Sequence, residues 1–233
     1  MIRVEVFSDV ICPWCFIGGR RLERAMRIVE ARSRTRFRAH YRAFALNPGM
    51  PAAGMERRAY RTAKFGSWKR SQELDAGTAT AAADDGITFN YAAMTRTPNS
   101  RPAHRLIKLA EQRSQLGSAM ADRLFSAYFS EGLDVGDPDT LAQLGREVGV
   151  DASLGELLLD GGPIDEAVED DVRRGEQLGV RSVPFFIVGG LAVPGAVSVD
   201  CLVTLLAEHA LVLPATTAGL DEAGGLDSPG CGS

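Results

Sequence analysis

The first 46 residues predict a strand, a helix and a second strand, and this order constrains the fold more than any other feature of the sequence. Residues 2–7 alternate apolar and charged side chains, which is typical of a half-buried strand. Residues 13–32 carry apolar side chains at helical spacing behind Pro13, and proline suits a first helical turn. Residues 37–46 alternate again. A helix of this length between two strands predicts a parallel pair with a right-handed crossover.

The rest of the chain continues with helices and ends in a hairpin. Residues 183–188 read as a buried strand, Gly189-Gly190 as a tight turn, 191–193 as a returning strand and 198–210 as a last helix. Residues 48–178 show no persuasive strand pattern, and prolines and glycines divide them into helices. These helices are expected near residues 56–64, 67–84, 102–116, 118–130, 138–148, 151–159 and 163–178.

The expected fold class is therefore α/β, with a large all-helical domain inserted between a β-α-β half and a β-β-α half. We place the β-α-β half at residues 1–47 and the helical insertion at 48–164. A connecting helix and the β-β-α half follow at 165–213. Residues 214–233 are rich in glycine, small and acidic residues, and they predict a flexible tail.

Charge is distributed unevenly along the chain. Residues 1–116 carry 21 Lys+Arg and 10 Asp+Glu, a net +11, whereas residues 117–233 carry 5 and 20, a net −15. In a compact fold we expect the two halves to neutralise each other in part across their contact, with the remaining charges on a solvated basic face and a solvated acidic face. An arginine-lined approach for an anionic substrate is the alternative. The overall net charge of −4 argues against a nucleic-acid partner.

The sequence shows no targeting or membrane signal. Its first residues lack a basic segment followed by an apolar run, and no stretch of about 20 apolar residues could span a bilayer. We therefore expect a cytoplasmic protein with no membrane partner, in a compartment where thiols are kept reduced.

The motif Cys12-Pro13-Trp14-Cys15 lies between the first strand and the first helix. At a helix start, two residues between cysteines allow the sulfurs to close a small ring. Free N–H groups and the helix dipole favour a thiolate at Cys12, whereas Cys15 lies one turn further in. We predict that Cys12 is the attacking nucleophile and that Cys15 resolves the mixed disulfide. Asp9 serves either as a turn or cap residue or as the acceptor of the Cys15 proton.

Two other interpretations of the cysteine pair are weaker. A zinc site needs two further ligands at suitable spacing, and no second close-spaced pair is present. The remaining residues that could ligate zinc are Cys201, Cys231, His40, His104 and His209. A pair of inert core cysteines does not account for Pro13 and Trp14 at a strand-to-helix turn. We expect neither a metal nor a required organic cofactor.

A second candidate element is Val183-Pro184, at the start of the strand predicted over residues 183–188. A cis peptide here would leave the Val183 backbone free to pair with a substrate strand beside Cys12. An ordinary trans proline at the start of a strand remains the alternative from the sequence alone.

Four motifs together resemble the DsbA-like family of thioredoxin-fold proteins, within its cytoplasmic FrnE-like branch. The resemblance covers about residues 1–210. The motifs are Phe7-Ser8-Asp9-Val10-Ile11-Cys12-Pro13-Trp14-Cys15-Phe16-Ile17-Gly18, Phe44-Ala45-Leu46-Asn47-Pro48, Thr97-Pro98-Asn99-Ser100-Arg101-Pro102-Ala103-His104-Arg105-Leu106 and Gly179-Val180-Arg181-Ser182-Val183-Pro184-Phe185-Phe186.

The resemblance implies a thioredoxin fold with an inserted helical domain, and a cis Pro184 packed beside the dithiol. It further implies that Asn99 helps to line the cleft and that His104 lies close to it; a satisfied helix histidine is the alternative for His104. Trp14 would pack over Cys15 or meet a partner protein. Related glutathione transferases of the kappa class and 2-hydroxychromene-2-carboxylate isomerases typically carry serine at the position of Cys12. Retention of both cysteines favours disulfide exchange.

We therefore expect a protein disulfide oxidoreductase that acts on protein disulfides or small thiol adducts, with glutathione as a conceivable redox partner. A glutathione-dependent isomerase or transferase of aromatic small molecules is the first alternative, and a peptide-binding, chaperone-like module the second. The sequence leaves a homodimer open.

Two cysteines lie outside the motif. Cys201 falls in an apolar helix and is expected to be a small buried residue. Cys231 lies in the predicted tail, where it is either passive or an auxiliary thiol that reaches Cys12 or another chain.

Overall fold

The computed structural model describes residues 1–212 of the chain. Its elements follow the expected order, with two short strands added. They are β1 (Ile2–Ser8), α1 (Pro13–Arg32), β2 (Phe37–Ala43), β3 (Met55–Glu56), α2 (Arg57–Phe65), α3 (Trp68–Ala81), β4 (Arg96–Thr97), α4 (Arg101–Ser114), α5 (Gly117–Phe129), α6 (Pro138–Val148), α7 (Leu154–Leu158), α8 (Pro163–Gln177), β5 (Phe185–Val188), β6 (Leu191–Pro194) and α9 (Val199–Val212).

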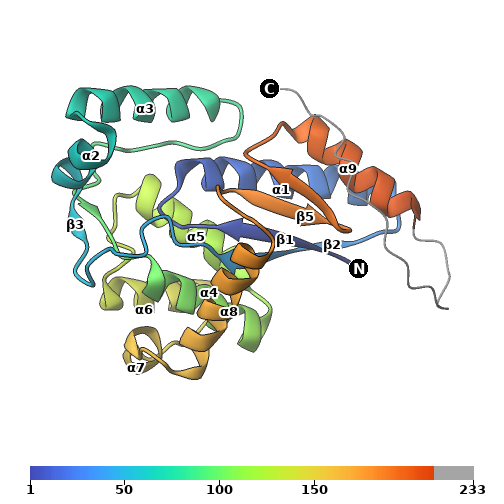
Figure 1. The fold of residues 1–233 in the computed structure, drawn as a ribbon. Coiled ribbons are helices and arrows are strands. Elements are labelled where there is room, and N and C mark those ends of the chain that lie inside the picture. Colours follow the sequence, from blue (N-terminus) through green and yellow to red (C-terminus); the bar gives the residue numbers. More distant parts are fainter. Residues whose placement is uncertain (213–233) are drawn as a thin grey trace.

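A four-stranded sheet in the order β2-β1-β5-β6 forms the centre of the fold (Figure 1). Strands β1 and β2 are parallel, as the β-α-β pattern predicts, with Val4 opposite Ala39. Strand β5 runs antiparallel to β1 and pairs with β6 through the expected hairpin. The expected β-α-β and β-β-α halves with a helical insertion are thus confirmed.

Glycine is required in the hairpin turn between β5 and β6. Gly189 and Gly190 have φ angles of +53° and +92°, and residues with a Cβ rarely adopt this conformation. The turn therefore explains the Gly-Gly pair in the sequence.

Helices cover both faces of the sheet (Figure 1). Helices α1 and α9 pack together on the face with the alternating apolar residues of β1 and β2. Helices α4 and α8 lie on the other face, where the ring of Phe7 packs against the backbone of Gly175 in α8. The dithiol motif thus follows the carboxyl end of β1, a central strand between two layers of helices.

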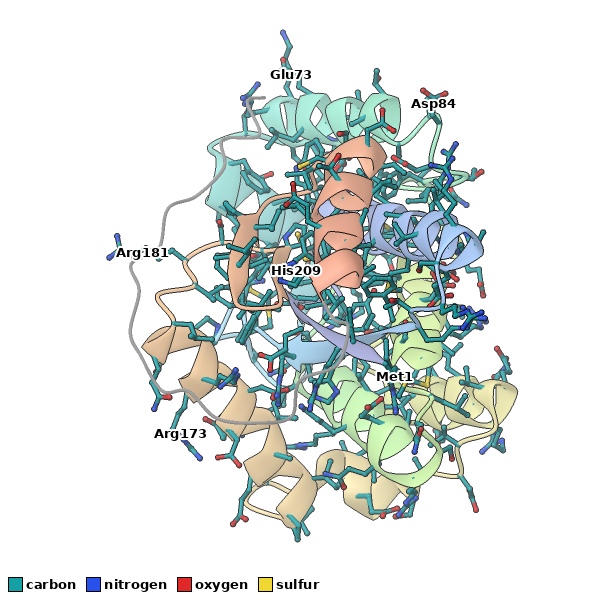
Figure 2. The ribbon with its side chains drawn as sticks, turned by 90° about the vertical axis from the view of Figure 1, so that its right-hand side faces the viewer. Met1, Glu73, Asp84, Arg173, Arg181 and His209 are labelled. Carbon is teal, nitrogen blue, oxygen red and sulfur yellow. The ribbon has the colours of Figure 1, made fainter. Side chains whose placement is uncertain are left out.

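Ion pairs join the basic first half of the chain to the acidic second half. Arg42 of β2 binds Asp171 of α8 at 2.7 Å, and Arg101 of α4 binds Asp165 of α8 at 2.6 Å. These contacts confirm that the two halves neutralise each other in part. Other charged side chains, such as Asp84 and Arg173, point away from the molecule (Figure 2).

The structure differs from the sequence-based expectation at three places. Strand β2 ends at Ala43 instead of residue 46, because the N–H of Leu46 donates to the Asp9 carboxylate at 2.8 Å. The two-residue ladder of β3 and β4 interrupts the region expected to be wholly helical. Helix α3 ends at Ala81 instead of residue 84. Helix α8 begins at Pro163, the start expected from the sequence, and it contains the boundary placed between residues 164 and 165. The predicted tail, 214–233, lies outside the described residues.

No helix within residues 1–212 is both long and apolar enough to cross a membrane.

Candidate active site

The dithiol motif forms the turn from β1 into α1. Cys12 has an extended backbone (φ −97°, ψ 114°) and immediately precedes the helix, which begins at Pro13. The N–H of Cys15 donates to the carbonyl oxygen of Cys12 at 3.1 Å and so closes the first turn. Cys12 and Cys15 lie 3.4 Å apart and are not joined by a disulfide. The structure therefore shows two neighbouring cysteines with free thiols.

The two cysteines differ in their access to solvent. Cys12 is 6% exposed and lines a pocket, whereas Cys15 is 1% exposed and does not line it. Burial and the neighbouring Cys12 raise the pKa of the Cys15 thiol well above its ordinary value. The backbone N–H of Asp9 and the hydroxyl of Ser8 act against this rise in pKa, because both can donate to a thiolate.

The Val183–Pro184 segment lies beside the dithiol. The peptide bond between these residues is cis, which is the conformation that the resemblance implies. The Cys12 thiol donates to the carbonyl oxygen of Val183, with the sulfur and oxygen 3.7 Å apart. Pro184 packs against Gly18 of α1. Residues 171 positions apart in the sequence thus meet at the candidate nucleophile.

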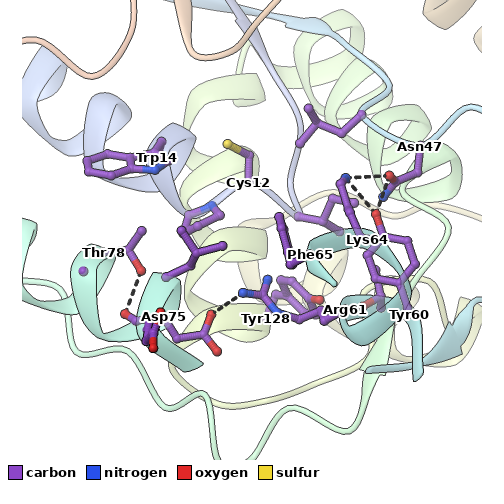
Figure 3. Close-up of a pocket in the computed structure, with 17 residues that line it drawn as sticks. Cys12, Trp14, Asn47, Tyr60, Arg61, Lys64, Phe65, Asp75, Thr78 and Tyr128 are labelled. Atoms are coloured by element: carbon purple, nitrogen blue, oxygen red, sulfur yellow. Dashed lines mark hydrogen bonds and ion pairs between the residues drawn. The ribbon is translucent and has the colours of Figure 1, made fainter. Parts of the chain in front are cut away.

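A pocket of about 530 Å³ opens beside Cys12 (Figure 3). The motif forms one wall, and helices α2 and α3 of the insertion form the opposite wall. Trp14 is 43% exposed and contributes its ring to the rim. The lining residues are Ile11, Cys12, Pro13, Trp14, Leu46, Asn47, Tyr60, Arg61, Lys64, Phe65, Glu73, Leu74, Asp75, Gly77, Thr78, Thr97 and Tyr128. This lining is mostly apolar, with its polar groups grouped at two corners.

At one polar corner of the pocket, the charged Lys64 side chain hydrogen-bonds to two uncharged side chains. The ammonium of Lys64 donates to Asn47 Oδ1 at 2.9 Å and to the Tyr60 hydroxyl at 2.8 Å (Figure 3). Asn47 Nδ2 is buried and has no hydrogen-bond partner among the described residues. This corner therefore presents a positive charge and an unused donor to the pocket.

The other polar corner joins α2 to α3. The Asp75 carboxylate accepts from Arg57 and from Arg61, each at 2.7 Å. The guanidinium of Arg57 also lies over the ring of Trp68, 5.5 Å from its centroid. These contacts hold the two helices together as a cover over the pocket.

Arg21 of α1 anchors the far end of this cover. Its guanidinium donates to the Ala81 carbonyl oxygen at 2.8 Å and binds Asp85 at 2.9 Å, at and just beyond the end of α3. It also donates to the carbonyl oxygen of Ala196 at 2.8 Å. The inserted helices are thus tied to the helix that begins at the dithiol.

The structure places two of the residues singled out from the sequence away from this pocket. The Asn99 amide donates to the Met50 carbonyl oxygen at 2.9 Å and accepts from the N–H of Arg101 at 2.9 Å, so it holds a loop. His104 is buried, with Nε2 3.7 Å from Oδ1 of Asp9. Neither residue lines the pocket.

Sequence reasoning missed the pocket wall formed by Asn47, Tyr60 and Lys64. Tyr60 and Lys64 are four residues apart and share one face of a predicted helix, which was the available signal. Nothing in that spacing says that the helix folds over the dithiol.

The structure describes one of the two cysteines outside the motif. Cys201 is half-buried in α9 and packs against the core. Cys231 lies outside the described residues. Within residues 1–212, no group of three or more His, Cys, Asp or Glu side chains could hold a metal ion.

Comparison with known proteins places these features in a family. Residues 3–207 match the model of the DSBA-like thioredoxin domain. The crystal structure of a probable DsbA oxidoreductase from Streptomyces coelicolor is 28% identical, with a TM-score of 0.79 over 95% of this chain and 94% of that chain.

Two more distant structures share the fold. The cytosolic disulfide reductase DsbM from Pseudomonas aeruginosa, determined with GSH, is 19% identical, with a TM-score of 0.61 over 91% of this chain and 96% of that chain. A 2-hydroxychromene-2-carboxylate isomerase is 14% identical, with a TM-score of 0.63 over the same shares of the two chains. The match over residues 3–207 spans nearly all of the described chain, and the protein therefore belongs to the DsbA-like thioredoxin domain family.

Proposed function

We propose that this protein is a thiol–disulfide oxidoreductase in which Cys12 attacks and Cys15 resolves. The observation that carries the proposal is the asymmetry of the pair: Cys12 opens to the pocket, while Cys15 is buried behind it. A substrate disulfide can therefore reach the first sulfur but not the second. Membership of the DsbA-like family supports the same chemistry.

The reaction proceeds in two exchanges. The Cys12 thiolate attacks one sulfur of the substrate disulfide, the substrate S–S bond breaks, and the departing thiolate takes the electron pair. Cys15 then loses its proton and attacks the Cys12 sulfur, which releases the second substrate thiolate and leaves a Cys12–Cys15 disulfide. The opposite sequence of steps oxidises a substrate dithiol.

The pocket and the Val183 backbone provide the substrate site in this proposal. Val183 offers main-chain groups to an extended peptide beside Cys12. Pro13 and Trp14 line the same opening, and the mostly apolar pocket takes the side chain or adduct next to the attacked sulfur. We propose protein disulfides and small thiol adducts as substrates, with glutathione as one redox partner. The distant DsbM structure, determined with GSH, supports the small-thiol class.

A reductase or isomerase direction in the cytoplasm is part of the same proposal. A glutathione pool favours dithiols over disulfides, so a reduced Cys12–Cys15 pair would donate electrons there. The fold that this chain shares with DsbM, which is a cytosolic disulfide reductase, supports a cytoplasmic location.

A glutathione-dependent isomerase is the second candidate, because the 530 Å³ pocket beside Cys12 is large enough for a small aromatic molecule. The fold shared with an isomerase also supports it. The two functions differ in their need for Cys15, which isomerisation would not use.

Insulin reduction by the Cys12→Ser and Cys15→Ser variants tests the proposal. We expect Cys12→Ser to abolish turnover, and Cys15→Ser to accumulate a mixed disulfide at Cys12 that mass spectrometry identifies. Asp84→Asn, which changes an exposed side chain outside the pocket, is the control and should retain turnover. Full activity of Cys12→Ser would refute the assigned nucleophile, and glutathione-dependent isomerisation by Cys15→Ser at the wild-type rate would favour the second candidate.

A further inference from the structure

A second, much smaller cavity lies away from the substrate pocket, at the carboxyl ends of β1 and β2. Its volume is about 10 Å³, close to the space that one water molecule requires. Its walls come from β1, β2, α4 and α5. The lining residues are Ser8, Val10, Tyr41, Arg42, Ala43, His104, Ile107, Lys108, Ala121 and Phe125.

Three residues at this cavity hold buried polar atoms without a partner. Ser8 Oγ, His104 Nε2 and Arg42 Nε make no hydrogen bond among the described residues. A buried polar group left unpaired destabilises the fold. A buried water typically makes about three hydrogen bonds to such groups, and these three atoms are the partners that one water would need.

The same cavity wall adjoins the resolving cysteine. The Ser8 hydroxyl is one of the two groups that oppose the raised pKa of Cys15. His104 Nε2 lies 3.7 Å from Oδ1 of Asp9. Hydrogen bonds from the N–H groups of Ile11 at 3.2 Å and Leu46 at 2.8 Å hold that carboxylate in place.

We infer that Ser8, a water bound in this cavity and His104 form a relay that takes the proton of Cys15 during resolution. The inference rests on the proposed function and deepens it. A substrate joined to Cys12 would occupy the pocket that Cys12 lines, and the relay gives the proton of Cys15 a route on the other side. His104 acts through Ser8 and the water, and is therefore a positioning residue.

Three proton transfers accompany the thiol–disulfide exchange at Cys12. The Cys15 proton moves to Ser8 Oγ as the Ser8 proton moves to the water, and the water gives a proton to Nε2 of His104. The electron pair left on Cys15 forms the bond to the Cys12 sulfur. The bond between Cys12 and the substrate breaks, with its pair on the departing sulfur.

The charges around His104 are compatible with a transient imidazolium. Asp9 faces Nε2 and stabilises a positive ring. Arg42 and Lys108 line the opposite part of the cavity, and both pair with Asp171 of α8. The Asp171 carboxylate therefore offsets part of the positive charge that Arg42 and Lys108 place near the His104 ring.

Stopped-flow release of thionitrobenzoate from 5,5′-dithiobis(2-nitrobenzoate) separates attack from resolution. The first phase reports attack by Cys12, and the second reports its displacement by Cys15; Cys12→Ser supplies the background from other sites. We expect His104→Gln to slow the second phase by about 100-fold at pH 7 and to leave the first phase within about twofold. In the variant, the second-phase rate should rise in proportion to hydroxide across pH 5–8, whereas the wild-type rate levels off.

Two further variants make the result decisive. Ser8→Ala removes a single hydroxyl and should slow the second phase, and its second-phase rate should likewise rise with pH without reaching a plateau. This variant tests the relay even where His104→Gln unfolds. His40→Gln changes a histidine on β2 outside the cavity and should behave as wild type. Second-phase rates within twofold of wild type in Ser8→Ala, at every pH, would overturn the relay. A wild-type protein without a second phase would overturn the proposed function itself.

Discussion

Pro184 packs on the backbone of Gly18 so closely that a Cβ on Gly18 would lie 2.8 Å from Cγ of the proline ring. The same Cβ would lie 3.1 Å from the ring of Phe186, the second residue of β5. Helix α1 can therefore approach the Val183–Pro184 segment only because residue 18 has no side chain. This approach keeps the Val183 carbonyl oxygen next to the Cys12 sulfur.

A Gly18→Ala substitution should therefore destabilise the protein. At an open helical position the change would stabilise by about 1 kcal/mol, but here the overlap with Pro184 should cost about 1–3 kcal/mol. We also expect insulin reduction to fall, because the loop beside Cys12 must shift. Urea unfolding and turnover are the measurements. Gly77→Ala in α3, where a Cβ would meet nothing within 4 Å, is the control for the unfolding measurement and should stabilise. An unchanged unfolding midpoint in Gly18→Ala would contradict the packing argument.

Lys64 should select disulfides that carry carboxylates. Replacement by Met keeps the aliphatic stem and removes the charge at the corner with Asn47 and Tyr60. An exposed ion pair is worth up to about 1 kcal/mol, so kcat/KM for glutathione disulfide should fall about fivefold. Uncharged hydroxyethyl disulfide should be affected less than twofold, and added salt should narrow the difference. Lys69→Met, an exposed lysine of α3 outside the pocket, is the matched control. An equal fall for both disulfides would count against the assignment.

Asp165 makes the α4–α8 contact sensitive to acid. Burial alone would raise the pKa of Asp165, but hydrogen bonds from Arg101, the N–H of Gly161 and Arg105 outweigh it and hold the pKa well below its ordinary range. A carboxyl with a depressed pKa in the folded state stabilises the protein above its unfolded pKa of about 3.9. That stabilisation is lost as the pH falls through the folded value.

The Asp165→Asn variant tests this linkage. We expect a loss of about 3 kcal/mol at pH 7, because the buried Arg105 loses its buried carboxylate partner and keeps only the exposed Asp160. Between pH 4 and pH 2, the free energy of unfolding should fall less steeply in the variant than in the wild type. Urea unfolding at pH 7, 4 and 2.5 measures both effects. Asp84→Asn, an exposed carboxylate, should follow the wild-type curve.

Local patterns in the sequence predicted most of the fold. Alternation in residues 2–7 and helical spacing in 13–32 depend on nearest neighbours, and the structure has β1 and α1 there. The two-residue strands β3 and β4 could not be predicted, because Met55 pairs with Thr97 across 42 residues and leaves no alternation to read.

In the candidate site too, local motifs could be predicted from the sequence and long-range packing could not. The dithiol and Val183-Pro184 lie in contiguous motifs, and the structure brings them together. The pocket wall depends on how the insertion folds back over the dithiol, which is a tertiary property that spacing in α2 does not encode. Asn99 was expected at the cleft from its motif, yet its amide is committed to the Met50 and Arg101 backbone.

Asp75 should control the cover over the pocket without controlling the whole fold. Helices α2 and α3 pack mainly on each other and on the β3–β4 ladder, so this region can open locally. Asp75→Asn leaves the guanidiniums of Arg57 and Arg61 facing each other without a carboxylate, and Arg57 is buried. Removing one partner of a buried ion pair costs about 3 kcal/mol. We expect this loss to lower the free energy of opening of α2 and α3.

We expect amide hydrogen exchange in residues 57–75 of Asp75→Asn to be about 100-fold faster than in the wild type, a ratio that corresponds to roughly 2.7 kcal/mol. Exchange in β1 and β5 should change little, because the core does not depend on this pair. Substrate KM should rise, since the wall opposite Cys12 is then ordered only part of the time. Glu73→Gln alters an α3 carboxylate that pairs only with neighbouring Arg70 among the described residues, and should leave exchange unchanged. Wild-type exchange rates in residues 57–75 of Asp75→Asn would show that packing on Trp68 and Tyr91, and not the shared carboxylate, holds the cover in place.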